Sequence, residues 1–400
     1  MLHSILKHMK VGLSKEVFLT LLTQFLSLFT PLLLILYIVQ GYGKSEVVVF
    51  EAILSVTAFI AILVDYGTST FYSFRNFNKR ATAKIVTTLF VLKLFVSLVG
   101  GIIGAFIFNV FDFDFFVLAV SILILLVSSF EIPYIYFANN KTHIFSLIQS
   151  LKYPLCIFFI FVTGELYISL VLSFIFVASI NLVYASKWYS FNFSFSYRIF
   201  GYTLSKYRTY TLTELLTGIF SQLDGFIASE LLPKEQAFLY VFLRKFVRAS
   251  NALLNYVYRI AFTRKMKGEN SNDSLTSFLL VINLFGAVSF FILSWLLKSN
   301  YPELQTYSSF EYYLVVFLLS SLLLVGCLKV LTRNNKLYTK YLFAIHFKST
   351  FISAISFCIP IYFFSSYLDA MLLSFFRLFA DALYIIVVFL CLKFGKVAKP

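Results

Sequence analysis

Apolar stretches long enough to cross a bilayer recur along the whole chain, separated by short polar connections. A hydrocarbon core of about 30 Å is spanned by about 20 helical residues. Windows of this kind fall at residues 17–40, 47–71, 85–108, 115–138, 144–163, 166–186, 209–231, 236–262, 277–297, 309–331, 342–366 and 370–392. The pattern therefore predicts twelve transmembrane helices.

The longest connection between these segments separates the first six from the last six. We predict an all-α integral membrane protein with two six-helix lobes, residues 1–190 and 209–400, joined by a cytoplasmic linker at 191–208. The string Leu-Leu-Thr-Gln-Phe-Leu-Ser at 21–27 is echoed by Leu-Leu-Thr-Gly-Ile-Phe-Ser at 215–221. Both segments run outward, so the echo indicates parallel lobes related by a pseudo-two-fold axis along the membrane normal.

Basic residues in the connections set the orientation of the chain. Of 33 lysines and arginines, 23 fall in connections on one side or at the adjoining ends of the segments, and three, Lys44, Lys234 and Lys298, fall on the other side. The positive-inside rule places the first side, with both termini, in the cytoplasm. The net charge of +15 therefore meets anionic membrane lipid, and it does not indicate binding of nucleic acid.

Composition and motifs narrow the function classes further. Sixty per cent hydrophobic residues and a mean hydropathy of +0.88 exclude a soluble globular protein. The four cysteines lie in apolar segments, without a CxxC or a Cys/His cluster, and no P-loop, GxSxG or HExxH motif occurs. The sequence therefore predicts no metal site, no cofactor and no enzyme.

The eighth segment, 236–262, carries polar residues along one helical face. Arginines and asparagines follow each other from Arg244 to Arg259 at steps of four, three, four and four residues, which is helical spacing, and a lysine adjoins the first arginine. A charge at the bilayer centre costs on the order of 2.5–3.5 kcal/mol on insertion scales. The helix is therefore expected to line a basic, wet passage or to bind an anion with Arg244, Lys245, Arg248, Asn251 and Asn255.

Two other interpretations of this segment remain open. It could be an amphipathic helix on the membrane surface, although the acidic residues before it and the basic cluster 259–267 after it favour a crossing. Alternatively, its arginines could be paired inside the protein, with Asp224 and Glu131 as candidate partners. The passage interpretation implies that the missing counter-charge of Arg244 and Arg248 arrives with the substrate.

Further charges fall inside the predicted spans. Lys93, Lys152 and Lys348 lie at similar depth near the cytoplasmic ends of their segments, where they can either form a basic vestibule or extend to the headgroups. Arg377 and Asp381 are four residues apart on the last segment and can pair with each other or face the passage. The candidates for gating or ion coupling are Asp65, Asp224 and Asp381.

Helix-breaking residues also occur within the segments. Pro31, Pro133, Pro154 and Pro360 interrupt spans and predict kinks there, because an interior proline removes a backbone hydrogen bond. Gly100 and Gly104 form a GxxxG pattern, which is typical of close helix packing in membranes.

Two short strings and the predicted architecture carry a family resemblance. The second segment closes with Leu63-Val64-Asp65-Tyr66-Gly67, and the seventh contains Gln222-Leu223-Asp224-Gly225-Phe226-Ile227, followed by a turn and the stretch 237–245. Together with twelve spans in two sets of six, these strings resemble the O-antigen and polysaccharide flippases of the multidrug/oligosaccharidyl-lipid/polysaccharide exporter superfamily. The Phe-rich composition is similar to that of proteins from AT-rich bacterial polysaccharide clusters.

The resemblance implies a substrate and a mechanism. An undecaprenyl-pyrophosphate-linked oligosaccharide would be moved from the cytoplasmic to the periplasmic leaflet of the bacterial inner membrane by alternating access. Buried cations suit its pyrophosphate, and arginine adds a bidentate fork. The resemblance also implies a polysaccharide polymerase and a chain-length regulator as partners.

Three alternatives stay open at this point. A drug or organic-cation antiporter of the same superfamily would line its cavity with acid, whereas the densest buried cluster here is basic. A peptidoglycan-precursor flippase also handles a polyprenyl pyrophosphate but often carries extra spans. A membrane-embedded polymerase would need a longer outer loop than the sequence predicts.

Overall fold

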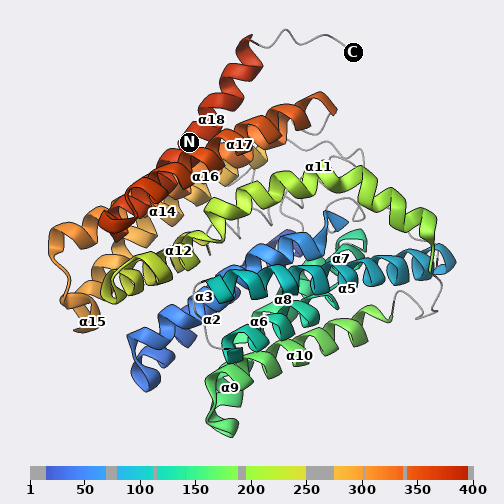
Figure 1. Cartoon of the computed structure of the whole chain (residues 1–400), viewed down its shortest axis with the longest axis horizontal. Coiled ribbons are helices and arrows are strands. Elements are labelled where there is room, and N and C mark those ends of the chain that lie inside the picture. Colours follow the sequence, from blue (N-terminus) through green and yellow to red (C-terminus); the bar gives the residue numbers. More distant parts are fainter. Residues whose placement is uncertain are drawn as a thin grey trace. The chain divides into compact units, whose positions relative to one another are not determined.

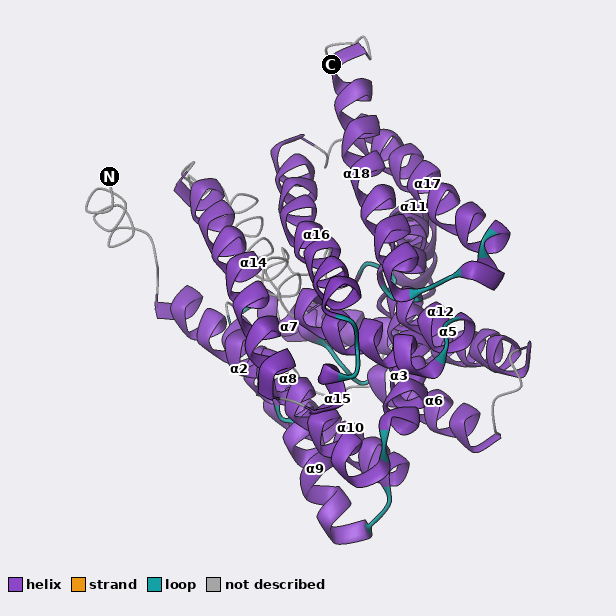
Figure 2. Cartoon of the chain, turned by 90° about the vertical axis from the view of Figure 1, so that its left-hand side faces the viewer, coloured by secondary structure: helices purple, strands orange, loops and turns teal. Residues whose placement is uncertain are grey.

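The computed structural model describes residues 15–68, 79–110, 115–139, 141–187, 195–248, 274–300, 302–336 and 340–394, and the regular structure of these residues is helical (Figures 1 and 2). Residues 234–248 are helical and carry no label in Figure 1; the other elements are given next. They are α2 Lys15–Tyr42, α3 Lys44–Asp65, α5 Lys79–Val110, α6 Phe115–Ser128, α7 Pro133–Ala138, α8 Thr142–Ser150, α9 Lys152–Thr163, α10 Leu166–Ala185, α11 Tyr197–Ser221, α12 Asp224–Leu231, α14 Ser274–Asn300, α15 Pro302–Gln305, α16 Ser309–Lys336, α17 Lys340–Phe363, the 3-10 turn η1 Ser365–Tyr367 and α18 Ala370–Phe394.

Helices lie at the described residues of every predicted span. Eight of them are long and apolar enough to cross a membrane: Lys44–Asp65, Ala83–Ile107, Phe115–Tyr136, His143–Thr163, Leu166–Ala185, Ser309–Gly326, Ala344–Phe363 and Ala370–Cys391. The regular structure of the described residues is therefore all helical, and the chain is a multi-pass membrane protein. The count of twelve crossings, the two six-helix lobes and the division at 191–208 stay predictions.

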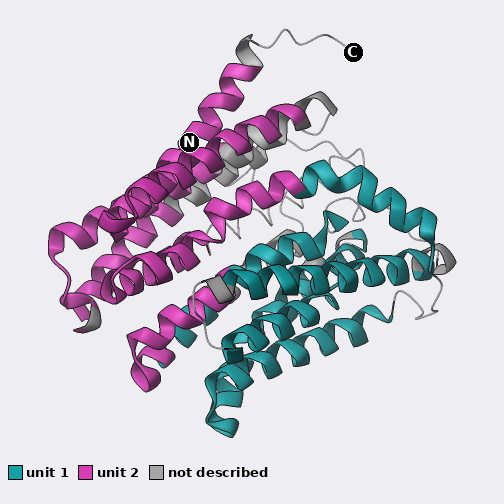
Figure 3. Ribbon diagram, in the orientation of Figure 1, with its two compact units in different colours: residues 1–37, 56–211, 259–274 teal, residues 38–55, 212–258, 275–400 magenta. Residues whose placement is uncertain are grey.

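The chain forms two compact units that are discontinuous in sequence (Figure 3). Unit 1 comprises residues 1–37, 56–211 and 259–274, and unit 2 comprises residues 38–55, 212–258 and 275–400. The boundary divides α2, α3 and α11, so that each of these helices contributes residues to both units. Unit 2 therefore includes the first half of α3, which becomes important for the site.

Unit 1 packs around an apolar core to which α5, α7 and α10 contribute. Its members are buried and mostly aliphatic or aromatic, among them Leu89, Leu92, Tyr134, Tyr136 and Val177. The predicted close packing at the GxxxG pattern is confirmed, since Gly100 and Gly104 both lie against the Ile60 side chain of α3. An added Cβ at Gly104 would lie 2.9 Å from Ile60 Cδ1, which leaves no room for alanine without movement.

Unit 2 is organised around α18, against which α16 and α17 both pack. The buried face of α18 carries Leu373, Ala380, Tyr384 and Val388 at helical spacing. Residues 237–247 of the eighth predicted span are all buried. Their burial contradicts the surface-helix alternative for the described part of this span, because a surface helix would expose one face.

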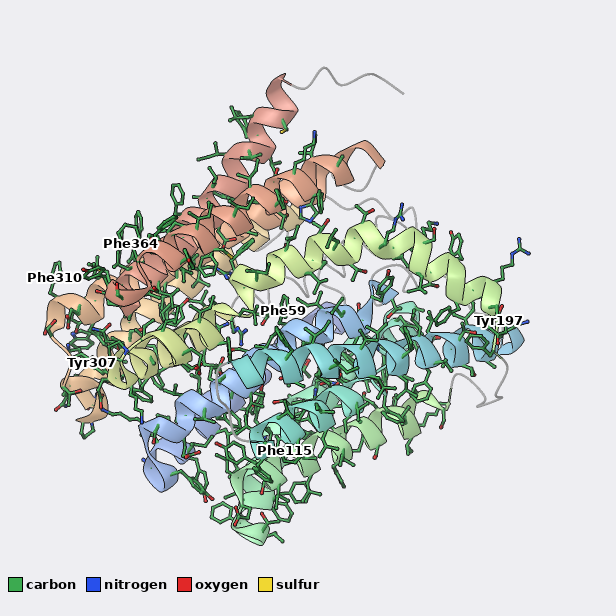
Figure 4. All side chains as sticks on the ribbon, viewed as in Figure 1. Phe59, Phe115, Tyr197, Tyr307, Phe310 and Phe364 are labelled. Atoms are coloured by element: carbon green, nitrogen blue, oxygen red, sulfur yellow. The ribbon has the colours of Figure 1, made fainter. Side chains whose placement is uncertain are left out.

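The outer faces of the helices are apolar. Phe115 is 80% exposed and Phe310 is 76% exposed, and both are among the labelled side chains in Figure 4. Large exposed side chains of this kind would be unfavourable in water but suit contact with lipid tails. Burial and polarity are thus arranged as in a membrane protein, with charges inside and hydrocarbon outside.

Three of the predicted spans are broken within the described residues. The fourth breaks between α6 and α7 just before Pro133, and the fifth between α8 and α9 near Pro154, as the proline positions indicate. Pro31 and Pro360 lie instead within the continuous helices α2 and α17. The seventh span breaks at residues 222–223 between α11 and α12 without a proline, and the main site lies at this break.

Candidate functional site: a charged cluster at a broken helix

The break in the seventh span exposes backbone carbonyl groups to two arginines. The N–H groups of Gln222 and Leu223 both turn back to the carbonyl oxygen of Gly218, at 2.7 and 3.1 Å, and end α11. The last carbonyl groups of a helix have no partner within the helix and attract positive charge. In this protein the partners are the guanidinium groups of Arg244 and Arg248, from the helical stretch 234–248.

Arg244 has the most completely enclosed side chain of the cluster's cations, with 3% exposed. Its Nη1 donates to Glu51 Oε1 at 2.9 Å, and its Nη2 donates to the Gln222 carbonyl oxygen at 2.8 Å, to the Ser221 carbonyl oxygen at 3.5 Å and to Asp224 Oδ1. One guanidinium thus joins α3, the end of α11 and the start of α12. Its planar fork suits this arrangement better than an ammonium group would.

Glu51 is the common acceptor for three cations. Arg248 Nη1 lies 3.1 Å from Glu51 Oε1, the same oxygen that accepts from Arg244, and Lys245 Nζ pairs with Glu51 Oε2. Arg248 Nη2 also donates to the Gln222 carbonyl oxygen at 3.1 Å and to the Gln222 side-chain oxygen. The Glu51 carboxylate is fully buried, so it interacts with these cations in a medium of low dielectric constant.

Asp224 pairs both with Arg244 and with a fourth cation, Arg377, and so connects Arg377 to the group around Glu51. Arg377 of α18 places Nη1 3.6 Å from Asp224 Oδ2 and donates through Nε to Asp381 Oδ2 at 3.3 Å. Arg377 and Asp381 therefore pair with each other, which is one of the two alternatives that the sequence left open. Tyr240 also donates its hydroxyl to Asp224 Oδ2 at 3.1 Å, and the Arg377 guanidinium lies over the Phe220 ring.

Among the residues that the structure describes, the cluster has more cations than carboxylates. Its cations are Arg244, Lys245, Arg248 and Arg377, its carboxylates are Glu51, Asp224 and Asp381, and their formal net charge is +1. Within this group the Arg248 side chain is the most exposed, at 23%, against 8% for Lys245. The excess charge is therefore most accessible at Arg248.

The expectation that the counter-charge of Arg244 and Arg248 arrives with the substrate is wrong. Glu51 and Asp224 of the protein itself neutralise these arginines, so no ligand is needed for that purpose. Asp224 was among the suggested partners. Glu131 was the other, but it pairs with Lys152 at 2.6 Å in unit 1.

Gly225, the second residue of α12, makes room for the Arg244 guanidinium. A Cβ added to Gly225 would meet Arg244 Nη1, and it would lie 2.6 Å from Ser55 Oγ and 2.9 Å from Arg244 Cζ. The absence of a side chain is therefore a condition for the contact between Arg244 and both carboxylates.

Gly225→Ala is accordingly expected to displace the Arg244 guanidinium without changing any charge. Overpacking of this kind destabilises proteins by about 1–3 kcal/mol, and the melting temperature in detergent should fall. Gly201→Ala is the matched control, because Gly201 lies in α11 with open space around its Cβ position. Equal melting temperatures for the two variants would contradict the assigned contact.

A second charged cluster lies in unit 1, at the break of the fourth span. Lys93 donates to the backbone carbonyl oxygen of Glu131 at 2.8 Å and lies 3.7 Å from Asp65 Oδ1. Lys152 pairs with the Glu131 carboxylate and lies over the Phe174 ring. Two cations face two carboxylates, so the formal charge of these four groups is zero.

The string Leu63–Gly67 ends α3 beside this second cluster. Tyr66 and Gly67 both have positive φ angles, 44° and 71°, which turn the chain out of the helix. A tyrosine rarely adopts this conformation, and the hydrogen bond from its hydroxyl to the Leu204 carbonyl oxygen, at 3.0 Å, holds it there. This string therefore orients Asp65 toward Lys93.

The remaining predicted site residues have separate positions. Lys348 is exposed on α17, so it does not share a buried position with Lys93. Asn251 and Asn255 fall outside the described residues. Three contributors were not predicted from the sequence as site residues: Glu51, Gly225 and the backbone carbonyl groups at 221–222. Glu51 was only one of several acids in the predicted spans, and helix breaks without proline leave no clear sequence signal.

No protein-family model matches the chain, and no curated protein matches it either. Solved structures do match. The lipid II flippase MurJ, in an inward closed conformation, has a TM-score of 0.63 at 15% identity, covering 94% of this chain and 87% of that chain. The MATE multidrug transporter DinF-BH has a TM-score of 0.57 at 14% identity, covering 96% of this chain and 97% of that chain.

A third match comes from a transporter of the MOP superfamily in Pyrococcus furiosus, with a TM-score of 0.53 at 13% identity, covering 96% of this chain and 97% of that chain. The similarities extend over nearly the full length of the chains. The protein therefore has the same fold as these transporters, which are a lipid II flippase, a multidrug transporter and a MOP superfamily transporter. At sequence identities of 13–15%, these similarities show the fold and not the substrate.

Proposed function

We propose that the protein is a flippase for an anionic, lipid-linked oligosaccharide. It would move an undecaprenyl-pyrophosphate-linked repeat unit from the cytoplasmic to the periplasmic leaflet of the bacterial inner membrane, with both termini in the cytoplasm. The transport would use alternating access of two six-helix lobes, and the protein would act as a carrier without catalytic residues. A polysaccharide polymerase and a chain-length regulator would act on the product.

One observation carries the choice of an anionic cargo. The cluster at the broken seventh span has a formal charge of +1, and the excess is most accessible at Arg248. A positive charge in a medium of low dielectric constant attracts an anion strongly, and a guanidinium can bind phosphate oxygens in a bidentate manner. The fold shared with MurJ, described as a lipid II flippase, supports a lipid-linked substrate.

The proposed site divides into contacting and supporting residues. Arg248 and Lys245 would contact the pyrophosphate, and Asn251 and Asn255 would offer hydrogen bonds to sugar hydroxyl groups. Arg244, Arg377, Asp224 and Asp381 would hold the contacting cations in place. Lys93, Lys152, Asp65 and Lys348 would serve the cytoplasmic entrance or the coupling of transport to an ion.

The test is complementation of a flippase-null strain. Arg248→Ala is expected to abolish surface glycan, while Arg248→Lys should restore part of it because the charge remains. Arg198→Ala is the control, since Arg198 is exposed on α11, and it should give normal glycan at matched expression. Normal surface glycan with Arg248→Ala would refute the assignment.

A drug or organic-cation antiporter is the second candidate, because MATE multidrug transporters share the fold. Such a protein should confer resistance to cationic dyes when overexpressed, with no effect on surface glycan. The basic cluster argues against it, since an organic cation would be repelled by the accessible charge of Arg248. Dye resistance that is kept in Arg248→Ala would favour this alternative.

A further inference from the structure

The position of Glu51 suggests a role that goes beyond neutralising the cluster. Three cations converge on this one carboxylate, and two of them, Arg248 and Lys245, are the ones that would contact the cargo. Any phosphate group that binds these two cations must therefore share them with Glu51 or replace it. The following inference rests on the proposed function.

We propose that Glu51 is an internal counterion that the diphosphate group of the cargo displaces from Lys245 and Arg248. The charges balance in this exchange. A diphosphate that links a lipid to a sugar carries two negative charges, and Lys245 and Arg248 together carry two positive ones. Glu51 thereby determines how much negative charge the cargo must bring in order to compete.

The cations do not depend equally on Glu51 for their positions. Arg244 is also held by Asp224, by two backbone carbonyl groups and by the space at Gly225. Arg248 is also held by the backbone and side-chain oxygens of Gln222. When the cargo displaces Glu51, the two guanidinium groups therefore keep their orientation. Preorganisation of this kind favours binding, because little ordering remains to be done.

A carrier also needs such a counterion when it is empty. After releasing its cargo the protein must return to its cytoplasm-facing conformation, and several unneutralised cations in a low-dielectric interior would oppose that step. Glu51 comes from α3, whereas the cations come from the stretch 234–248, so the pairing also joins two distant segments of the chain. The same carboxylate thus stabilises the empty state and competes with the loaded one.

The test compares Glu51→Gln with the unmodified protein in detergent, using farnesyl diphosphate as the probe and farnesol as the uncharged reference. Removing a negative charge adjacent to the bound diphosphate should tighten its binding about tenfold or more, with no change for farnesol. The same variant should fail to complement a flippase-null strain. Glu235→Gln is the matched control, because Glu235 pairs with Lys44 on an exposed surface of unit 2, and its affinity should equal that of the unmodified protein.

Two further variants separate the possible outcomes. Arg248→Ala should bind the probe at least about tenfold more weakly; unchanged affinity would refute the proposed function. If Arg248→Ala binds the probe more weakly, and Glu51→Gln binds it no more tightly than the unmodified protein, the counterion role is refuted while the proposed function stands. The double variant E51Q/K245Q has the original formal charge and should return toward the original affinity; binding as tight as in E51Q would also refute the role.

Glu51→Gln is itself expected to be less stable, because three cations lose their shared partner. Its melting temperature provides a second measure. The probe should raise the melting temperature of E51Q by more than it raises that of the unmodified protein, since tighter ligand binding stabilises the folded state more at the same ligand concentration. A smaller rise in E51Q would overturn the proposal.

Discussion

Replacing Arg244 by methionine is expected to remove most of the folded protein. Methionine is close to arginine in length but cannot donate to Glu51, Asp224 or the carbonyl groups at the end of α11. Breaking a buried ion pair by removing one partner destabilises proteins by about 3–5 kcal/mol, which is a large part of the stability of an ordinary domain. The measurement is the yield and melting temperature after purification in a mild detergent.

Two companion variants locate the cause of that effect. Arg244→Lys keeps the charge but cannot reach two carboxylates and two carbonyl groups at once. Its stability should therefore lie between that of Arg244→Met and that of the unmodified protein. Arg198→Met makes the same substitution at an exposed position of α11 and should stay within about 0.5 kcal/mol. If Arg244→Met melts like Arg198→Met, the cluster does not hold α3, α11 and α12 together.

Asp224→Asn is the second substitution expected to have a large effect. It keeps the size of the side chain and an oxygen to accept the Gly225 N–H, but it leaves Arg244 and Arg377 without the charge they share. The formal charge of the cluster rises from +1 to +2, and we expect a loss of about 3–5 kcal/mol. The melting temperature in detergent, together with the yield of folded protein, provides the measurement.

Asp369→Asn is a matched control for the local role of the carboxylate. Asp369 precedes α18 and accepts the Leu372 N–H at 2.6 Å, and asparagine serves equally well at such a position. Its stability should therefore not change. An unchanged melting temperature in Asp224→Asn as well would show that the carboxylate acts through its backbone hydrogen bond and not through its charge.

The double variant R244M/D224N closes a thermodynamic cycle. Because Arg244 and Asp224 are in direct contact, the double variant should be less destabilised than the sum of the two single variants. It also restores the formal charge of +1. Additive effects would indicate that each residue acts through other partners, in which case Arg244 with Glu51 becomes the pair to examine.

The two charged clusters also differ in a way that bears on function. In unit 1, Lys93 and Lys152 face Asp65 and Glu131, and the formal charges cancel. In unit 2 the cluster around Glu51 retains a positive charge and has a partly exposed arginine. Both clusters use cations to satisfy carbonyl groups at a broken helix. We therefore propose that the unit 2 cluster, and not the unit 1 cluster, contacts the cargo.

The sequence alone determined the class of the protein and the identity of its unusual cations. Hydrophobic segments of bilayer length predict membrane helices because no other structure satisfies the backbone in lipid as simply. Arg244, Lys245 and Arg248 stand out for the same reason, since charges within such segments are costly. The pairing of Arg377 with Asp381 was also predictable, because residues four apart share a helix face.

The tertiary structure decided which charges meet. Glu51 lies nearly two hundred positions before Arg244, and no local spacing connects them. The break at 222–223 has no proline, so its free carbonyl groups could not be anticipated, and neither could the need for glycine at 225. The described cations of the basic stripe, Arg244, Lys245 and Arg248, pair with carboxylates of the protein itself, whereas the sequence suggested that their counter-charge comes from the substrate. Long-range packing in a low-dielectric interior, and not the local pattern, sets its remaining charge.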